Sequence, residues 1–160
     1  MKKLKNFTVE QYLSALASRQ PAPGGGSAAA LTGALGAGLL SMVAQYSIGK
    51  GKPPTIEKRL KATLKTTEAL RLKLLRLVDL DAEAYLKVVQ SKNKPPKIKQ
   101  KVLREAEAVP KEICRACQQA IHLAPLLAKE GNFYLLGDTK AGVELLFASF
   151  SAASAFTKQS

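Results

Sequence analysis

The stretch from Gln20 to Gly49 contains no charged side chain and is rich in Ala and Gly. When residues 28–48 are drawn as a helix, apolar residues fall on every side of it. A helix of this kind is either the buried centre of a bundle or a membrane span. Its larger apolar residues are Leu31, Leu35, Leu39, Leu40, Met42, Val43 and Ile48.

The composition of this helix favours a bundle core over a membrane span. Its Leu, Val and Ile residues together contribute only about −2 to −4 kcal/mol to membrane insertion. Gln45, Ser41 and Ser47 oppose insertion, whereas Gly33 and Gly36 allow a neighbouring backbone to approach closely. We therefore expect no membrane span here and place this helix at the centre of the protein.

Pro and Gly residues divide the rest of the chain into further helices. Thr8 and Gln11 are spaced as a capping box at the start of the first helix. The first three expected helices cover residues 9–20, 28–48 and 56–91. A fourth helical region, which Pro110 and Pro125 should kink or split, ends at Gly131 and Asn132, and a last helix starts near Thr139. A length of 160 residues suffices for one core. The sequence predicts a single all-α domain over residues 1–160, a bundle of about five helices around the Ala/Gly-rich helix.

The net charge of +13 leaves several partners open. Nucleic acid, an anionic surface, an acidic small molecule and simple solubility are all compatible with it. The positive charges are spread over several predicted helices, and no interleaving of aromatic and basic residues occurs. Nucleic-acid binding is therefore not favoured.

Cys114 and Cys117 form a single C-x-x-C pair inside a helical pattern. A zinc site needs four ligands, and His122 is the only histidine in the chain. Two small, partly buried residues are thus a better interpretation than a metal or redox site, and we expect no metal. Free cysteines fit a reducing cytoplasm. The basic N-terminus is soon interrupted by polar residues, so a cytoplasmic protein without a signal peptide is expected.

Asp81 is the most informative charged residue. It falls on the apolar stripe of the helix 56–91, three residues after Val78 and four before Tyr85, whereas Asp79 and Glu83 fall outside the stripe. A buried carboxylate without a partner costs several kcal/mol. Asp81 is therefore either held in a structural pair or placed in a cleft, where a shifted pKa suits proton transfer.

The segment 21–27, Pro-Ala-Pro-Gly-Gly-Gly-Ser, precedes the uncharged helix. Its prolines stiffen the first half, its glycines permit conformations closed to other residues, and Ser27 is the expected N-cap. It follows a helix rather than a strand and lacks the spacing of a dinucleotide-binding motif. A glycine loop at a helix N-terminus leaves backbone N–H groups available for an anion or carboxylate. A plain tight turn is the alternative.

These segments together resemble the cyclodeaminase/cyclohydrolase family of folate enzymes. The family includes the cyclodeaminase domain of formiminotransferase-cyclodeaminase and methenyltetrahydrofolate cyclohydrolases. The matching features are the segment 21–27, the Ala/Gly-rich helix ending in Ile48-Gly49-Lys50, the helix segment Asp79-x-Asp81-Ala82-x-Ala84-Tyr85, the pair Val109-Pro110, and Gly131-Asn132 with Asp138 six residues after the Asn. The resemblance covers nearly the whole chain.

Family members close 5-formiminotetrahydrofolate to 5,10-methenyltetrahydrofolate with loss of ammonia, or open the methenyl compound to 10-formyltetrahydrofolate. The resemblance implies a dimer or larger assembly, a folate substrate, and no metal or other cofactor. It also implies that Asp81 is the general acid/base and that Lys50 stabilises negative charge. The implied substrate-binding residues are Gly24, Gly25, Gly26, Ser27, Lys50, Asn132 and Asp138.

Two other functions remain open at this point. A relative could bind folate, or act as a scaffold, without catalysing, and a basic helical protein could bind nucleic acid. If the chain is a folate enzyme, its positive charge has a specific use. Cellular folates carry an acidic polyglutamate tail that a basic rim around the site would attract.

Overall fold

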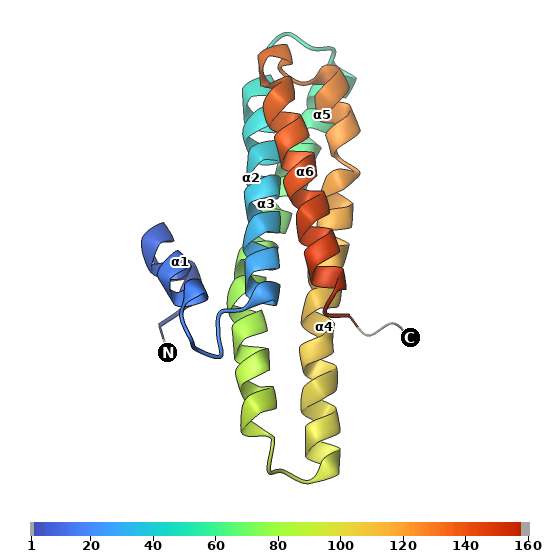
Figure 1. Ribbon diagram of the computed structural model, residues 1–160. Coiled ribbons are helices and arrows are strands. Elements are labelled where there is room, and N and C mark those ends of the chain that lie inside the picture. The colour runs from blue at the N-terminus through green and yellow to red at the C-terminus, as the bar shows by residue number, and fades with distance from the viewer. Residues whose placement is uncertain (1, 158–160) are drawn as a thin grey trace.

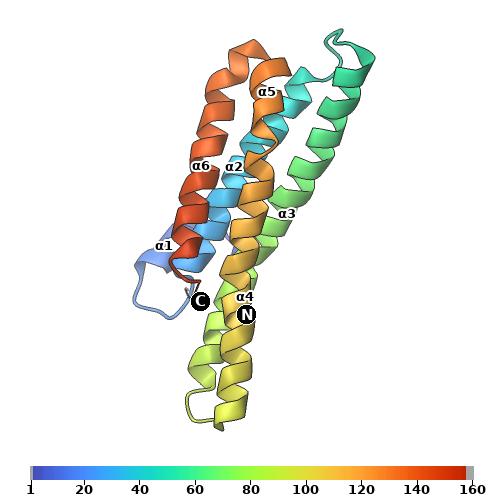
Figure 2. The same cartoon turned by 90° about the vertical axis from the view of Figure 1, so that its right-hand side faces the viewer.

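All regular elements of the computed structural model, which describes residues 2–157, are helical. Their order is η1 (Leu4–Asn6), α1 (Val9–Ala17), α2 (Gly25–Ser47), α3 (Pro54–Gln90), α4 (Pro96–Ile121), α5 (Ala124–Glu130), η2 (Phe133–Leu135) and α6 (Leu136–Ser154). Helices α2 to α6 form an elongated bundle, and α1 stands apart at its side (Figures 1 and 2). The prediction of an all-α bundle of about five helices is confirmed.

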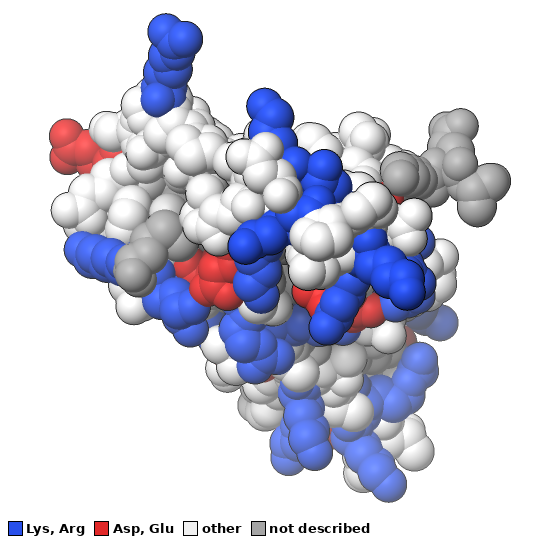
Figure 3. Space-filling view, turned by 90° about the horizontal axis from the view of Figure 1, so that it is seen from below, with Lys and Arg blue, Asp and Glu red and all other residues white. Residues whose placement is uncertain are grey.

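Helices α3 and α4 form a long hairpin that projects beyond the ends of α2 and α6 (Figure 1). Apolar side chains are needed only where α2 and α6 pack on the hairpin, so its projecting part carries many lysines. Viewed from this end, Lys and Arg side chains predominate over Asp and Glu on the surface (Figure 3). The projecting part of the hairpin is therefore a basic surface.

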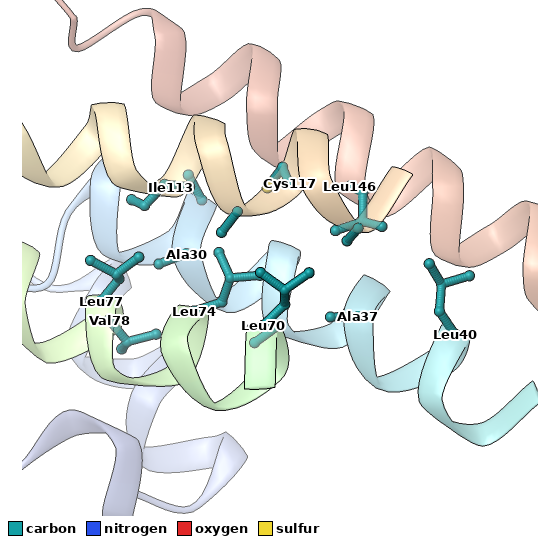
Figure 4. Close-up of a cluster of buried hydrophobic side chains, with 14 of the residues drawn as sticks. Ala30, Ala37, Leu40, Leu70, Leu74, Leu77, Val78, Ile113, Cys117 and Leu146 are labelled. Atoms are coloured by element: carbon teal, nitrogen blue, oxygen red, sulfur yellow. The ribbon is translucent and has the colours of Figure 1, made fainter. Parts of the chain in front are cut away.

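Helix α2 lies against both α3 and α6, and its inner side belongs to the main hydrophobic cluster (Figure 4). Within residues 2–157 it is the one helix long and apolar enough to cross a membrane, yet 61% of its most apolar window is buried inside the bundle. Leu40 and Leu74 on facing helices are both fully buried. The expected central position of this helix is confirmed.

Close contact between α2 and α6 depends on glycine. A Cβ atom added to Gly36 would lie 2.8 Å from the carbonyl oxygen of Gly142 and 2.8 Å from Cγ of Leu146. One added to Gly33 would lie 2.7 Å from Oγ of Ser149. The two helices could not keep their separation if these positions carried side chains.

Several helix boundaries differ from expectation. The capping box is confirmed, with Oγ1 of Thr8 accepting from the Gln11 N–H at 3.1 Å, but α1 ends at Ala17 rather than near Gln20. Helix α2 begins at Gly25, and α6 begins at Leu136 rather than Thr139.

The two prolines of the fourth helical region act differently. Pro110 lies inside α4 without splitting it, whereas the region does split into α4 and α5 at His122 and Leu123, just before Pro125. Pro125 occupies the first turn of α5, where a missing N–H removes no helical hydrogen bond.

We predict that Gly36→Leu destabilises the fold by about 3 kcal/mol, the upper end of the usual overpacking cost. The obstacle is partly the backbone of α6, which cannot move aside as a side chain can. Urea unfolding followed by far-UV circular dichroism measures this. The control is Gly137→Ala, because a Cβ there has no neighbour within 4 Å and alanine favours helix. Equal stability of Gly36→Leu and the wild type would contradict the packing described here.

Candidate active site at the glycine loop

A pocket of about 390 Å³ lies where the N-terminus of α2 meets α3, α4 and the end of α6. Its volume falls within the range of sites for small organic ligands. The glycines of segment 21–27 form one side of it. Asp81 and Tyr85 of α3 and Leu103 and Glu107 of α4 line other sides, with Phe156 after the end of α6.

Asp81 faces this pocket, half-buried beneath the first turn of α2. Burial raises the pKa of its carboxyl above the ordinary value, and a hydrogen bond from the backbone N–H of Ser27 opposes that rise. Burial is the larger of the two effects. The group therefore retains its proton at a higher pH than an ordinary aspartate, as a general acid/base requires.

The glycines of the loop are needed for space rather than for unusual backbone angles. A Cβ atom on Gly26 would overlap Oδ1 of Asp81, and one on Gly25 would lie 2.6 Å from Cζ of Phe156. Within residues 2–157, positive φ angles occur only at Gly49 and Gly51. The expectation that the loop needs conformations closed to other residues is therefore wrong for Gly24 to Gly26.

Ser27 is not the N-cap of α2, because Gly24 holds that position. Ser27 is completely buried in the first turn, and its Oγ lies 2.8 Å from the hydroxyl of Tyr12. Tyr12 is itself buried, and burial raises the pKa of its phenol. The pair fixes α1 against the start of α2. The sequence did not point to Tyr12 as a partner of Ser27, and the hydroxyl of Tyr12 was the one available hint of this contact.

Asp79 is buried, which contradicts the expectation that it lies off the buried face. It is only 6% exposed, and its Oδ1 accepts the N–H of Leu4 at 2.6 Å. Its Oδ2 is buried without a hydrogen-bond partner among the described residues. Asp79 is buried because η1 packs against α3 on the side that carries Asp79. Asp79 is thus a structural residue that anchors the N-terminal segment.

Lys50 and Asn132 lie at the opposite end of α2, and Asp138 lies in the first turn of α6, which follows Asn132 along the chain. The backbone N–H of Asn132 donates to Oγ of Ser47 at 2.8 Å, which places the α5–α6 connection beside the end of α2. The 23 residues of α2 separate this end from the glycine loop by about 34 Å. Within one chain, these three residues therefore do not share a pocket with Asp81.

The two cysteines lie away from the pocket, on α4. Cys117 is buried, its Sγ is 3.2 Å from Oγ of Ser149, and burial raises the pKa of its thiol to about 11. Cys114 is partly buried, and its thiol pKa is also raised. Both thiols are therefore protonated at neutral pH and serve as small packing groups.

Comparison with known proteins gives one family over nearly the whole chain. Residues 8–158 match the family described as formiminotransferase-cyclodeaminase. A methenyltetrahydrofolate cyclohydrolase of Methylorubrum extorquens is 39% identical over 153 residues, covering 89% of this chain and 73% of that protein. The formimidoyltransferase-cyclodeaminase of Mus musculus is 30% identical over 153 residues, covering 89% of this chain but 28% of that protein.

Comparison of the fold with solved structures points to the same family. The crystal structure of formiminotetrahydrofolate cyclodeaminase from Thermotoga maritima matches with a TM-score of 0.91 and 28% sequence identity, over 96% of this chain and 78% of that one. This chain belongs to the formiminotransferase-cyclodeaminase family, whose named members are enzymes acting on folate one-carbon derivatives.

Proposed function

We propose that this chain is a cytoplasmic folate enzyme that interconverts one-carbon derivatives of tetrahydrofolate. It either closes formiminotetrahydrofolate with loss of ammonia or opens methenyltetrahydrofolate with water. The observation that carries the proposal is the position of Asp81, a carboxyl of raised pKa in a ligand-sized pocket. Both reactions add or remove only ammonia, water and protons, so the proposal includes no metal or other cofactor.

The first turn of α2 provides the second half of the site. Its N–H groups have no partners within the helix, and that of Ser27 is used by Asp81. The N–H groups of Gly25 and Gly26 remain to bind a carbonyl or a developing negative charge on the substrate. Tyr85, Leu103 and Phe156 supply apolar surface for a flat pterin ring.

Asp81 acts as the general acid/base under this proposal. In the deaminase direction it moves a proton as N10 closes on the formimino carbon and ammonia leaves. In the hydrolase direction it takes a proton from the water that attacks the methenyl carbon. A pKa raised above the ordinary value for Asp suits both steps, since the group must exist in both protonation states.

We predict that Asp81→Asn lowers turnover about a hundredfold or more, the usual effect of losing a general acid/base. The absorbance of methenyltetrahydrofolate follows both reactions in purified protein. Glu83→Gln is the matched control, because it removes a carboxylate two residues away that pairs with Lys3 outside the pocket. Asp79→Asn is not a suitable control, since Asp79 holds the N-terminal segment. Full activity of Asp81→Asn would exclude this mechanism.

The same variant gives a stability test. Because folding raises the pKa of Asp81, the folded state binds its proton more tightly than the unfolded state. Its negative charge therefore costs stability above the folded pKa. Asp81→Asn should be more stable than the wild type at neutral pH, and this advantage should disappear as the pH falls toward about 3.9, the ordinary value for Asp. A purely structural Asp81 would give a less stable variant at neutral pH.

The basic surface of the α3–α4 hairpin adjoins the pocket. Val88 and Leu103 line the pocket near the projecting part of the hairpin. Lys99 lies one helical turn before Leu103 on the same side of α4, and Lys92 follows the end of α3. A polyglutamate tail that leaves the pocket along the hairpin would meet the positive charge of Lys92 and Lys99.

We predict that polyglutamylated folate binds more tightly than the monoglutamate and that this difference shrinks with added salt. The double variant Lys92→Gln/Lys99→Gln should reduce the difference, whereas Lys65→Gln/Lys111→Gln, which removes the same charge from exposed positions elsewhere, should not. For each protein, isothermal titration calorimetry measures the affinity for the polyglutamylated and the monoglutamate folate, each at low and at high salt. If the two folates bind with equal affinity at low salt, the basic surface of the hairpin does not attract the polyglutamate tail.

We also propose that the chain acts as a homo-oligomer, the state that the family resemblance implies.

A further inference from the structure

The wall of the pocket that α4 forms is one stripe along the helix. Leu103, Ala106, Glu107 and Pro110 all line the pocket, and positions three, four and seven residues after Leu103 lie on the same side of a helix. Apart from Glu107 the stripe is apolar. Glu107 is therefore a charged group on an otherwise apolar stripe of α4, as Asp81 is on α3.

The mechanism proposed above uses only one of the two carboxyl groups in the pocket. Asp81 is the general acid/base, and Glu107 has no part in the proton transfer. The lining includes no Lys or Arg among the described residues. A ligand group that carries N–H donors is therefore favoured beside Glu107, because a carboxylate is only an acceptor, and an anionic group is not.

Pro110 adds a further acceptor to the same wall. It lies inside α4, and because proline has no N–H, the carbonyl oxygen of Ala106 lacks the helical hydrogen bond that residue 110 would otherwise donate. The proline ring also pushes this carbonyl away from its usual direction. Ala106 and Pro110 both line the pocket, so the carbonyl lies on the pocket side of α4, next to Glu107. A backbone carbonyl released in this way can accept a hydrogen bond from a ligand.

The pterin ring of a tetrahydrofolate has matching donors. Its 2-amino group and the adjacent N3–H present three N–H bonds on one edge, and the carbonyl at C4 follows on the same edge. A carboxylate can accept two parallel N–H bonds, as it does from arginine. The two oxygens of Glu107 and the carbonyl of Ala106 thus provide three acceptors for three N–H bonds. The C4 carbonyl is left for the N–H groups of Gly25 and Gly26.

The same groups determine which end of a folate enters the pocket. The tail of the molecule carries carboxylates, which Asp81 and Glu107 would repel. The pterin end carries N–H donors and no negative charge. The pocket therefore selects the pterin and leaves the tail to the basic surface of the hairpin.

We propose that Glu107 and the backbone carbonyl of Ala106 recognise the 2-amino and N3–H edge of the pterin, and so determine which ring the pocket accepts. This inference deepens the proposed function and rests on it for the identity of the ligand. The reacting N5 and N10 lie away from this edge. Glu107 is therefore a specificity-determining residue, whereas Asp81 acts on the reacting atoms.

The test uses 5-formyltetrahydrofolate, which has a formyl oxygen in place of the formimino nitrogen, and its analogue without the 2-amino group. Isothermal titration calorimetry should show that the wild type binds the 2-amino compound about tenfold more tightly or better, as expected for a hydrogen bond to a charged group. In Glu107→Ala this preference should fall to about threefold or less, since only a neutral acceptor remains. Alanine favours helix, so the fold should be kept.

Glu105→Ala is the matched control, because it removes an exposed carboxylate from the same helix outside this pocket. It should keep the wild-type preference. A wild type that binds the two compounds equally, or a Glu107→Ala variant that distinguishes them as the wild type does, would overturn the proposal.

The carbonyl of Ala106 is tested by Pro110→Ala, which restores an N–H that can bond this carbonyl within the helix. Affinity for 5-formyltetrahydrofolate should fall about threefold, the effect of losing a neutral hydrogen bond, whereas affinity for the analogue should not. Pro125→Ala is the control, because that proline lies in the first turn of α5. No loss in Pro110→Ala, or an equal loss for both compounds, would overturn the role given to the carbonyl.

Kinetics separates this role from that of Asp81 and from the proposed function. Glu107→Ala should raise KM more than it lowers kcat, the reverse of Asp81→Asn. A wild type that shows the Glu107-dependent preference but acts on neither folate would contradict the proposed function and leave this inference intact. An active wild type whose preference does not depend on Glu107 would do the opposite.

Discussion

The contact between Gly26 and Asp81 is the constraint on which the site depends. Any side chain at position 26 would occupy the space of the carboxylate, so only glycine lets α3 present Asp81 beneath the first turn of α2. This contact removes the carboxyl group from water and brings it to the Ser27 N–H. Burial raises the pKa of the carboxyl and the hydrogen bond lowers it, and because burial is the larger effect, the carboxyl keeps its proton at a higher pH than an ordinary aspartate.

Helix α2 serves three purposes with one composition. Its N-terminal turn forms the site, its inner glycines let α6 approach, and its outer leucines remain uncovered in a single chain. The absence of charge from Gln20 to Gly49 indicates a core helix when only one copy is considered. The structure gives a fuller account, because Gly36 faces α6 while Leu35, the preceding residue, is mostly exposed. A helix can be apolar on every side without being buried on every side.

The sequence predicted those features that depend on local periodicity. Spacing along α3 placed Asp81 on an inward side, and the lack of charge placed α2 at the centre. The predictions from sequence failed where a segment distant along the chain determines whether a residue is buried and what it contacts. Asp79 is buried by η1, a segment 75 residues away along the chain, and Ser27 is bonded to Tyr12 rather than capping its own helix. No periodicity in α2 or α3 contains that information. The family resemblance likewise supplied Lys50, Asn132 and Asp138 as members of a site but no distances between them.

The pocket and the basic surface of the hairpin act on different ends of the proposed substrate. Asp81 and the N–H groups at the start of α2 lie at the glycine loop, whereas Lys99 lies toward the projecting part of the hairpin, one helical turn before Leu103. A folate bound with its pterin against the glycine loop would therefore direct its acidic tail along the hairpin. Charge removed from the hairpin should alter affinity for long tails, whereas loss of the Asp81 carboxyl should alter turnover, because only the latter acts on the reacting atoms.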